Sequence, residues 1–383
     1  MTAPLPATTP AVPARSEPAR SEPARSESAE PPTGEPSPAL ATARLNAATV
    51  LLWRSEVSLQ LELGLRRVVI DNVAAEQVSP LLVRPEGRQN QARASPADSC
   101  PTELAGVLAA AGFLTEQAPG EPDAPLAAQY KPELAALTGR HGDAAAAVLA
   151  NRGRAAVAVH GTSRITASIA STLASAGVGW VQLVHGGDVA AADACPGGLT
   201  PTDEGSRFGV AGVAAIHRCA PGTQTVPIPR NRFADLVILT DPAPVEPSVR
   251  ASLHLDGLAH LPVTVDGSSA VIGPLVAPGI SSCLRCADLH RCERDPCWPM
   301  LAVQLAARPR RRIGSEVALC LAAAGLAAGQ ALAFLDGRRP ETVNATLEWQ
   351  LPDWRLRRRS WPAHHDCDCG AATGSAKHGR MGS

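Results

Sequence analysis

The chain has 383 residues, enough for one large core and a smaller module. Hydrophobic residues make up 45% of it and its formal net charge is −1, a balance that argues against nucleic acid or an anionic membrane as a partner. Ten cysteines occur without a signal peptide in the opening MTAPLPATTP, so we expect a cytoplasmic protein whose close cysteine pairs bind metal.

Both ends of the chain, residues 1–42 and 371–383, are predicted to be disordered tails. The first is rich in Pro, Ala, Ser and Glu and contains a tandem PARSE repeat. Such a composition buries too little apolar surface to offset the entropy lost on ordering. A recognition segment is the functional alternative to a solvated tail.

Residues 43–116 are predicted to form a small α+β module. Leu59, Leu61 and Leu63 alternate onto one face of a middle strand. The expected strands and helices cover Thr49–Trp53, Val57–Leu63, Arg67–Ile70, Val73–Val83 and Thr102–Ala111, with a polar loop at Pro85–Ser99. This content fits a winged-helix module, which could bind DNA, a peptide or its neighbour in the chain. The second helix carries few basic residues, which disfavours DNA.

After a linker with helical pieces at residues 117–150, residues 151–370 are predicted to form an α/β domain. It opens with a strand, a helix and a strand, the βαβ unit of a doubly wound parallel sheet. These elements and two later strands are expected at Arg154–Val159, Ile165–Ala176, Trp180–Val184, Leu236–Leu239 and Leu261–Val265.

The apolar run Val317–Leu335 is long enough to span a membrane. It consists mostly of Ala and Gly, contains Gln330 and lacks an aromatic belt. We therefore expect a buried helix of the α/β core.

The turn after the first strand of the βαβ unit decides whether the domain binds a nucleotide. Nucleotide-binding units have a glycine-rich turn there, because the backbone must approach phosphates at the helix N-terminus. Here only Gly161 of that pattern is present, and Ser163 places a Cβ at the closest approach. His185 replaces the acid expected after the second strand, with Asp188 three residues on. We expect a Rossmann-like scaffold that has lost its nucleotide; the alternative is a working site at Gly161, Ser163 and Asp188.

Two close cysteine pairs form the candidate metal site: Cys283 and Cys286, and Cys367 and Cys369. Four thiolates satisfy tetrahedral zinc and leave no open position, which predicts a structural zinc. Ordinary buried thiols are the alternative interpretation. Side chains that could replace one of these ligands are His290, Cys292, Cys297, His364 and His365. No base partner for a catalytic thiol at position 292 or 297 can be read from the sequence.

These motifs together resemble the ThiF-like adenylyltransferases, which are enzymes of the ubiquitin-activating type. The βαβ unit with Ala176–Gly179 comes first, followed by Ala234–Asp241 and the cysteine pairs. More specifically, the chain resembles the ThiF-like cyclodehydratase partner proteins of azole-modified ribosomal peptide pathways, which act beside a YcaO enzyme. The stretches that carry this closer resemblance are Ile272–Val276, Pro278-Gly279, Cys283–Arg291, Asp295–Pro299 and His364–Gly370.

The resemblance covers the chain from Leu45 to Gly370. It implies that the N-terminal winged-helix module binds a leader peptide as an added strand, around Leu59, Leu61, Val68 and Val69. It also implies zinc on the two cysteine pairs. In this family the ThiF-like domain is often inactive towards ATP, and the YcaO partner carries out the ATP-dependent chemistry.

The chain departs from the active ThiF-like pattern in the crossover region. Cys195–Pro201 stands where active members have Asn-Leu-x-Arg, and Arg207 stands near the expected Lys. We therefore expect neither ATP as a cofactor nor catalysis by this chain alone. The first hypothesis is an accessory protein, a cytoplasmic homodimer, that binds a precursor peptide and presents it to a YcaO-type cyclodehydratase. The alternatives are a residual ATP-dependent adenylyltransferase of the ThiF type and a dimeric, non-catalytic scaffold in an unrelated complex.

Overall fold

The computed structural model describes most of the chain between Arg44 and Ala371. The described residues are 44–46, 49–64, 66–78, 102–115, 127–229, 231–241, 244–307 and 314–371. The tails expected at 1–42 and 371–383 lie outside these residues, apart from residue 371, as do residues 117–126 of the linker. The loop Pro85–Ser99 and the second half of the helix expected at Val73–Val83 also lie outside them.

The N-terminal module contains an antiparallel three-stranded sheet in the order β2-β3-β4. Its elements are β2 (Val50–Ser55), β3 (Ser58–Leu63), β4 (Arg66–Asp71), α1 (Ala75–Val78), α2 (Thr102–Ala110) and the paired short strands β1 (Arg44–Leu45) and β5 (Leu114–Thr115). The alternation predicted in the middle strand is confirmed, because Leu59, Leu61 and Leu63 are buried and pack with Leu108 and Phe113. One face of the sheet therefore forms the core of the module.

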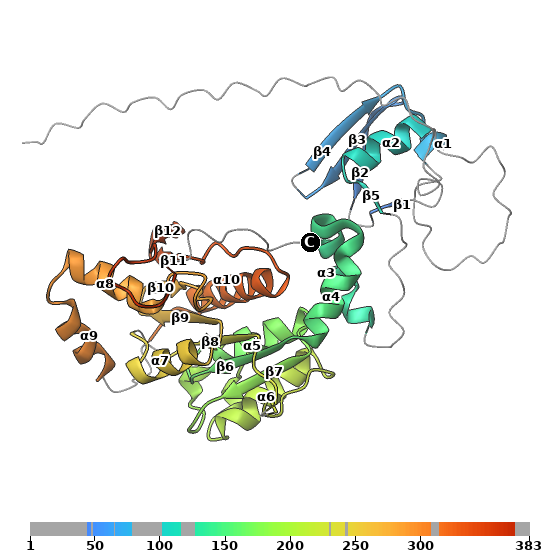
Figure 1. Cartoon of the computed structure of the whole chain (residues 1–383). Helices are drawn as coiled ribbons and strands as arrows, with labels where there is room; N and C mark the ends of the chain where they lie inside the picture. The colour runs from blue at the N-terminus through green and yellow to red at the C-terminus, as the bar shows by residue number, and fades with distance from the viewer. Residues whose placement is uncertain are drawn as a thin grey trace, which may run out of the picture.

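Two helices join the module to the large domain (Figure 1). They are α3 (Ala127–His141) and α4 (Ala145–Arg154), with a short 3₁₀ turn between them. The side chain of Leu63 in β3 lies over Gly139, where a Cβ would come within 3.5 Å of it. The module thus rests against α3.

The large domain is built on a seven-stranded sheet in the order β12-β11-β10-β9-β8-β6-β7. The strands are β6 (Ala156–His160), β7 (Trp180–Val184), β8 (Leu236–Leu239), β9 (His260–Asp266), β10 (Ser269–Ile272), β11 (Ala345–Gln350) and β12 (Arg357–Ser360). The first four are parallel, which confirms the predicted doubly wound half, with α5 (Thr166–Ser175) connecting β6 to β7. The strand expected at Leu261–Val265 is β9, whereas the antiparallel strands that follow it, β10 to β12, were not predicted.

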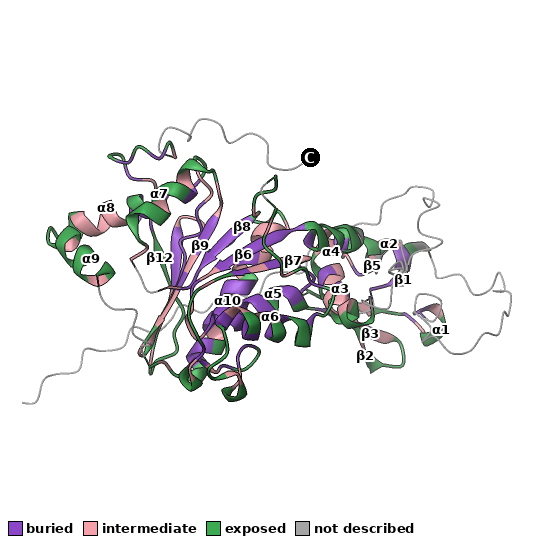
Figure 2. Cartoon of the chain, turned by 90° about the horizontal axis from the view of Figure 1, so that it is seen from below, coloured by how far each residue is buried: buried purple, intermediate pink, exposed green. Residues whose placement is uncertain are grey.

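The central parallel strands β6 and β8 are buried on both faces, as the purple strands in Figure 2 show. Val157, Val159 and Ile238 pack on one side with α5, whereas Ala158 and Val237 pack on the other with α7 (Pro247–Leu255). Burial on both faces explains why these strands are continuously apolar in sequence.

The apolar helix α10 (Val317–Leu335) is long and apolar enough to cross a membrane by length and composition alone. Its small residues, including Ala323, Ala327 and Ala331, are buried against β9, β10 and α5. The prediction of a core helix is therefore confirmed.

A buried arginine joins the connector helices to the large domain. Arg152, only 1% exposed, donates from Nε and Nη2 to the two carboxylate oxygens of Asp336, at 2.7 Å each. It also donates to Glu133 in α3 at 2.6 Å and to the carbonyl of Ala176 at 3.1 Å. A guanidinium this deeply buried needs such partners, because an unpaired charge in the interior is costly.

Asp336→Ala should therefore destabilise the chain by about 3–5 kcal/mol, since it leaves the Arg152 charge buried and without its bidentate partner. Chemical denaturation followed by circular dichroism measures this. The matched control is Asp353→Ala, which removes an exposed ion pair with Arg357 and should cost less than about 1 kcal/mol. Equal losses in the two variants would contradict the role given to Arg152.

Candidate functional site

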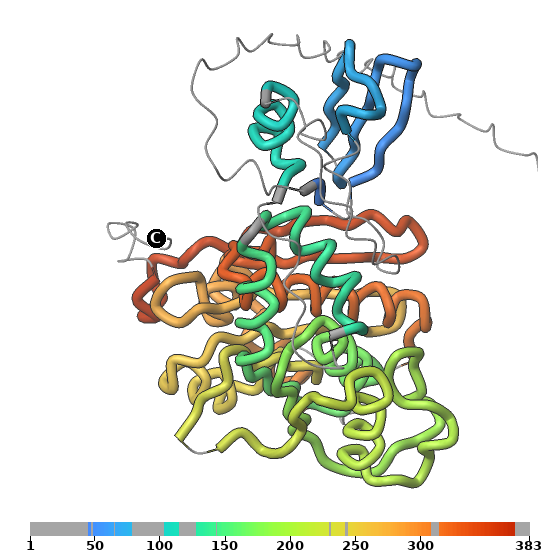
Figure 3. Tube along the Cα trace, turned by 90° about the vertical axis from the view of Figure 1, so that its right-hand side faces the viewer, coloured from blue at the N-terminus to red at the C-terminus, as the bar shows by residue number. Residues whose placement is uncertain are grey.

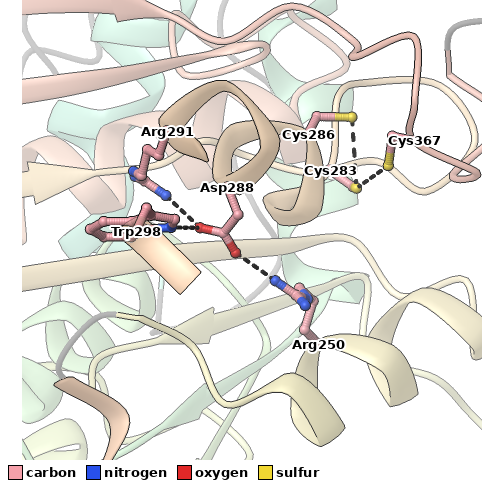
Figure 4. A network of polar contacts seen from close by, with 7 residues as sticks. All are labelled: Arg250, Cys283, Cys286, Asp288, Arg291, Trp298 and Cys367. Carbon is pink, nitrogen blue, oxygen red and sulfur yellow. Dashed lines mark hydrogen bonds and ion pairs between the residues drawn. The ribbon is translucent and has the colours of Figure 1, made fainter. Parts of the chain in front are cut away.

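The four cysteines of the predicted metal site lie together where the end of the chain meets α8 (Leu284–Arg294). Cys283 is the N-cap of α8 and Cys286 lies in its first turn, while the other two follow β12. The Sγ–Sγ distances are 3.8 Å for Cys283–Cys286, 3.6 Å for Cys283–Cys367 and 3.6 Å for Cys286–Cys369. All four side chains are buried, and Figure 4 shows three of them.

These distances fit a tetrahedral metal ion. Sulfurs at about 2.3 Å from a central zinc are about 3.8 Å apart in a tetrahedron. Disulfides need about 2.05 Å, so the cysteines are not paired covalently. The cluster could bind a metal ion such as zinc, with the four thiolates as a complete ligand set.

Neighbouring buried thiols also compete for protons. The hydrogen bond from Cys283 lowers the pKa of Cys286 to about 4, and the same contact, with burial, raises the pKa of Cys283. Burial raises the pKa of Cys367 to about 11. A divalent cation bound here would resolve this competition, because it would stabilise the thiolate form of every ligand.

The residues considered as substitute ligands are not part of this cluster. Cys292 is half-buried and Cys297 is exposed, and neither approaches the four sulfurs. His290 and His364 instead contact Glu293, and His365 is exposed beside Asp366. The structure therefore brings together the four predicted cysteines alone.

A polar network that the sequence analysis did not find lies beside the cysteines (Figure 4). Asp288 in α8 accepts from Arg250 at 2.7 Å, from Arg291 at 2.9 Å and from the indole Nε1 of Trp298 at 3.3 Å. Arg250 belongs to α7, so the network ties α8 to the parallel half of the sheet. Only the i,i+3 spacing of Asp288 and Arg291 could have indicated part of it.

The turn that would hold the phosphates in a nucleotide-binding unit lies at the carboxyl ends of β6 and β8, where the strand order reverses. Gly161 has φ +116° there, and a Cβ on it would meet Thr240 Oγ1 at 2.5 Å and Asp241 Oδ1 at 2.7 Å. Packing against the end of β8 thus requires this glycine, whether or not a phosphate binds.

Side chains of the turn bond to other parts of the protein. Thr166 Oγ1 lies 2.6 Å from Thr240 Oγ1 and 3.3 Å from Ser163 Oγ, so hydroxyls connect the start of α5 to β8. The Arg164 guanidinium donates to the carbonyls of Ala194 and Ser315, at 2.7 Å each. Hydrogen bonds of its own side chains thus fix the conformation of this turn.

The residues after β7 are also engaged. Asp188 forms an exposed ion pair with Arg207 at 3.5 Å. The His185 ring packs on Phe208 at a centroid distance of 5.4 Å, and burial lowers the pKa of this histidine. The residues singled out in the sequence around a ribose site are thus held in local contacts.

The four residues expected to contact a peptide divide into two groups. Leu59 and Leu61 are fully buried in the module core, and β3 is paired on both sides, so their assignment as peptide contacts is wrong. Val68 is half-buried, and Val69 is 38% exposed on the outer strand β4. The middle strand serves the core, and β4 is the strand that reaches the surface.

A cleft of about 450 Å³ lies between residues 194–201 and α6 (Phe208–Cys219). Arg218 borders it and donates to the carbonyl of Gly198 at 2.8 Å. In the sequence this segment is recognisable only as a departure from the ThiF-like pattern, because its shape depends on contacts with α6.

No protein-family model and no curated protein sequence significantly matches the chain. Solved structures do resemble it. Escherichia coli MccB with MccA-N7isoASN aligns with a TM-score of 0.63 and 13% identity, covering 86% of this chain and 99% of MccB. E. coli MccB with ATP gives 0.62 and 14% over 86% and 99% of the two chains. PaaA gives 0.54 and 15% over 68% and 91%. The chain therefore has the ThiF-like fold expected from its sequence.

Cys286→Ser should remove the metal from the cysteine cluster, since it replaces a soft thiolate ligand at the centre of the buried set. We expect metal content to fall from about one equivalent to less than about a tenth, with a lower unfolding temperature. Metal analysis after purification under reducing conditions measures this. Cys297→Ser, at an exposed thiol, should keep both values, and a metal-free wild-type chain would refute the metal site.

Calorimetry with ATP and magnesium should detect no binding tighter than about millimolar, because the turn at Gly161–Thr166 lacks the glycines that admit phosphates. Titrating ATP into the wild-type chain measures this directly. Binding in the micromolar range would show that the crevice still accepts a nucleotide.

Proposed function

We propose that the chain binds a precursor peptide through its N-terminal module and presents it to a modifying enzyme of the YcaO type. The observation that carries this proposal is the open edge of β4. Within the described part of the module, β4 pairs with β3 on one side and with no strand on the other. Backbone groups on such an edge are available to a peptide added as a further strand.

The position of α2 supports β4 as the edge strand to which a peptide would be added. Arg66 at the start of β4 donates to the carbonyl of Gly112, just after α2, at 3.4 Å. The end of α2 therefore lies within reach of the start of β4, and Figure 3 shows the teal helix α2 beside the blue strands. A peptide paired with β4 would have strand backbone on one side and helix side chains within reach.

The outer face of the sheet supplies apolar side chains. Leu52 and Val69 lie on either side of Gln60 in the strand register, and both are exposed. Exposed apolar side chains next to an open strand edge suit a partner that brings apolar residues of its own. Beside them, Arg67 and Glu62 form an ion pair at 3.0 Å.

The fold comparison supports the same function. The similar structures include MccB, described as a microcin C7 biosynthetic enzyme, in complex with N-formylated MccA. A protein of this fold thus binds MccA in the biosynthesis of microcin C7. We extend that role to this chain as binding and presentation.

We further propose that the chain does not catalyse adenylation by itself. The turn at Gly161 is braced by Ser163, Arg164 and Thr166, and it lacks the glycines of a phosphate-binding turn. The partner enzyme would then supply the ATP-dependent chemistry. In this proposal the cysteine cluster holds structural zinc, and the protein works as a cytoplasmic homodimer.

Val69→Asp should weaken peptide binding at least about tenfold, because it places a charge where an added strand would pack. The probe is a set of linear peptides enriched from a displayed random library by the full chain, and fluorescence anisotropy measures their affinity.

The matched control is Val57→Asp, an exposed substitution in the same module at the turn between β2 and β3. It should leave affinity unchanged. Equal weakening by both substitutions, or failure to enrich any peptide that prefers wild type over Val69→Asp, would reject β4 as the binding edge.

A further inference from the structure

A second group of metal-ligating side chains lies outside the cysteine cluster. His290 and Glu293 project from the same face of α8, and His364 comes from the segment after β12. One donor atom from each residue lies within 4.8 Å of the others. The i,i+3 spacing on α8 brings the first two together, and the fold supplies the third.

Both ring nitrogens of His290 face hydrogen-bond acceptors, one on Pro362 and one on Glu293. Its Nε2 lies 3.1 Å from the carbonyl oxygen of Pro362, which can only accept, so Nε2 carries a proton. In the neutral ring Nδ1 is then a lone pair, and it lies 3.2 Å from Oε2 of Glu293. A lone pair facing a carboxylate oxygen is repelled by it, so either a proton or a metal cation lies between the two atoms.

His364 contacts the other oxygen of the same carboxylate. Its Nδ1 accepts from the backbone N–H of Asp366 at 3.1 Å, so in the neutral ring Nε2 is the donor, and it donates to Oε1 of Glu293 at 3.0 Å. This bond holds the carboxylate and leaves Oε2 free to face His290. His364 is 2% exposed, so the bond is anchored in the interior.

We propose that His290 Nδ1 and Glu293 Oε2 bind a divalent transition-metal ion, with Pro362 and His364 as the positioning partners of the two ligands. All the contacts above then have a role. A ligating histidine commonly donates its other N–H to a carbonyl, and a ligating carboxylate is itself hydrogen-bonded. Nitrogen and oxygen donors suit zinc and its neighbours in the first transition row.

The surroundings of this histidine–glutamate site make the ion exchangeable. Glu293 is 53% exposed, so two protein ligands leave the remaining positions to water or an incoming anion. The guanidinium groups of Arg291 and Arg294 lie over Trp361 at 4.8 and 5.0 Å. Arg291 shares the single negative charge of Asp288 with Arg250. The net positive charge of these arginines weakens binding of the metal cation and favours an anion at its open coordination positions. We therefore expect weaker binding than at the four cysteines.

Titration of the full chain with zinc chloride, followed by calorimetry and metal analysis, tests the site. Wild type should bind two equivalents, a tight one lost in Cys286→Ser and a weaker one lost in His290→Ala and in Glu293→Gln. His364→Ala should weaken the second equivalent about 10–100-fold, as expected for a residue that positions a ligand. His217→Ala, at an exposed histidine of α6 away from this cluster, should change neither equivalent.

Nitrogen NMR of the His290 ring separates a metal from a proton. Zinc should shift Nδ1 in wild type, with Nε2 remaining protonated. A ring protonated on both nitrogens and unaffected by zinc would overturn the proposal, as would a second equivalent that survives both His290→Ala and Glu293→Gln. Thermal unfolding of each variant confirms that the chain remains folded.

Discussion

The contact between the two cysteine pairs determines how the second half of the chain closes. Cys283 and Cys367 are 84 residues apart in sequence, and their sulfurs lie 3.6 Å apart. The intervening chain forms α8, α9 (Trp298–Ala306), α10, β11 and β12, so the last two antiparallel strands lie inside this loop. Closing such a long loop costs entropy, which metal binding can offset. A metal ion bound by the four cysteines would therefore contribute to the folding of this half.

The cysteine cluster and the turn at Gly161 differ in how far the sequence motif is completed by the structure. The cysteine pattern is complete, and the structure assembles it. The turn at Gly161 keeps its glycine for packing against Thr240 and Asp241, while Ser163 and Thr166 fill it with hydroxyl contacts. A motif residue can thus persist for a packing reason after the pattern around it has changed.

The strands, helices and cysteine set were predictable because each has a local signature. Leu59, Leu61 and Leu63 alternate, Val157 to Val159 are continuously apolar, and the cysteines come in close pairs. The antiparallel strands β10 to β12 were not predicted. β12, for example, reads Arg-Arg-Arg-Ser and is exposed at the sheet edge, so its sequence shows no apolar pattern. The Asp288 network and the His290–Glu293–His364 contacts depend on distant segments. Burial of Leu59 and Leu61 decided against them as peptide contacts, since a strand's inner face cannot also face a ligand.

The ion pairs of Arg152 have a consequence for how the module is carried. Glu133 lies in α3, the helix against which Leu63 of the module rests, and Asp336 lies just after α10 in the core. The guanidinium of Arg152 therefore links α3, on which the module rests, to the large domain. A peptide bound on β4 would therefore have a fixed orientation relative to the large domain, because buried ion pairs hold the connector helices in place.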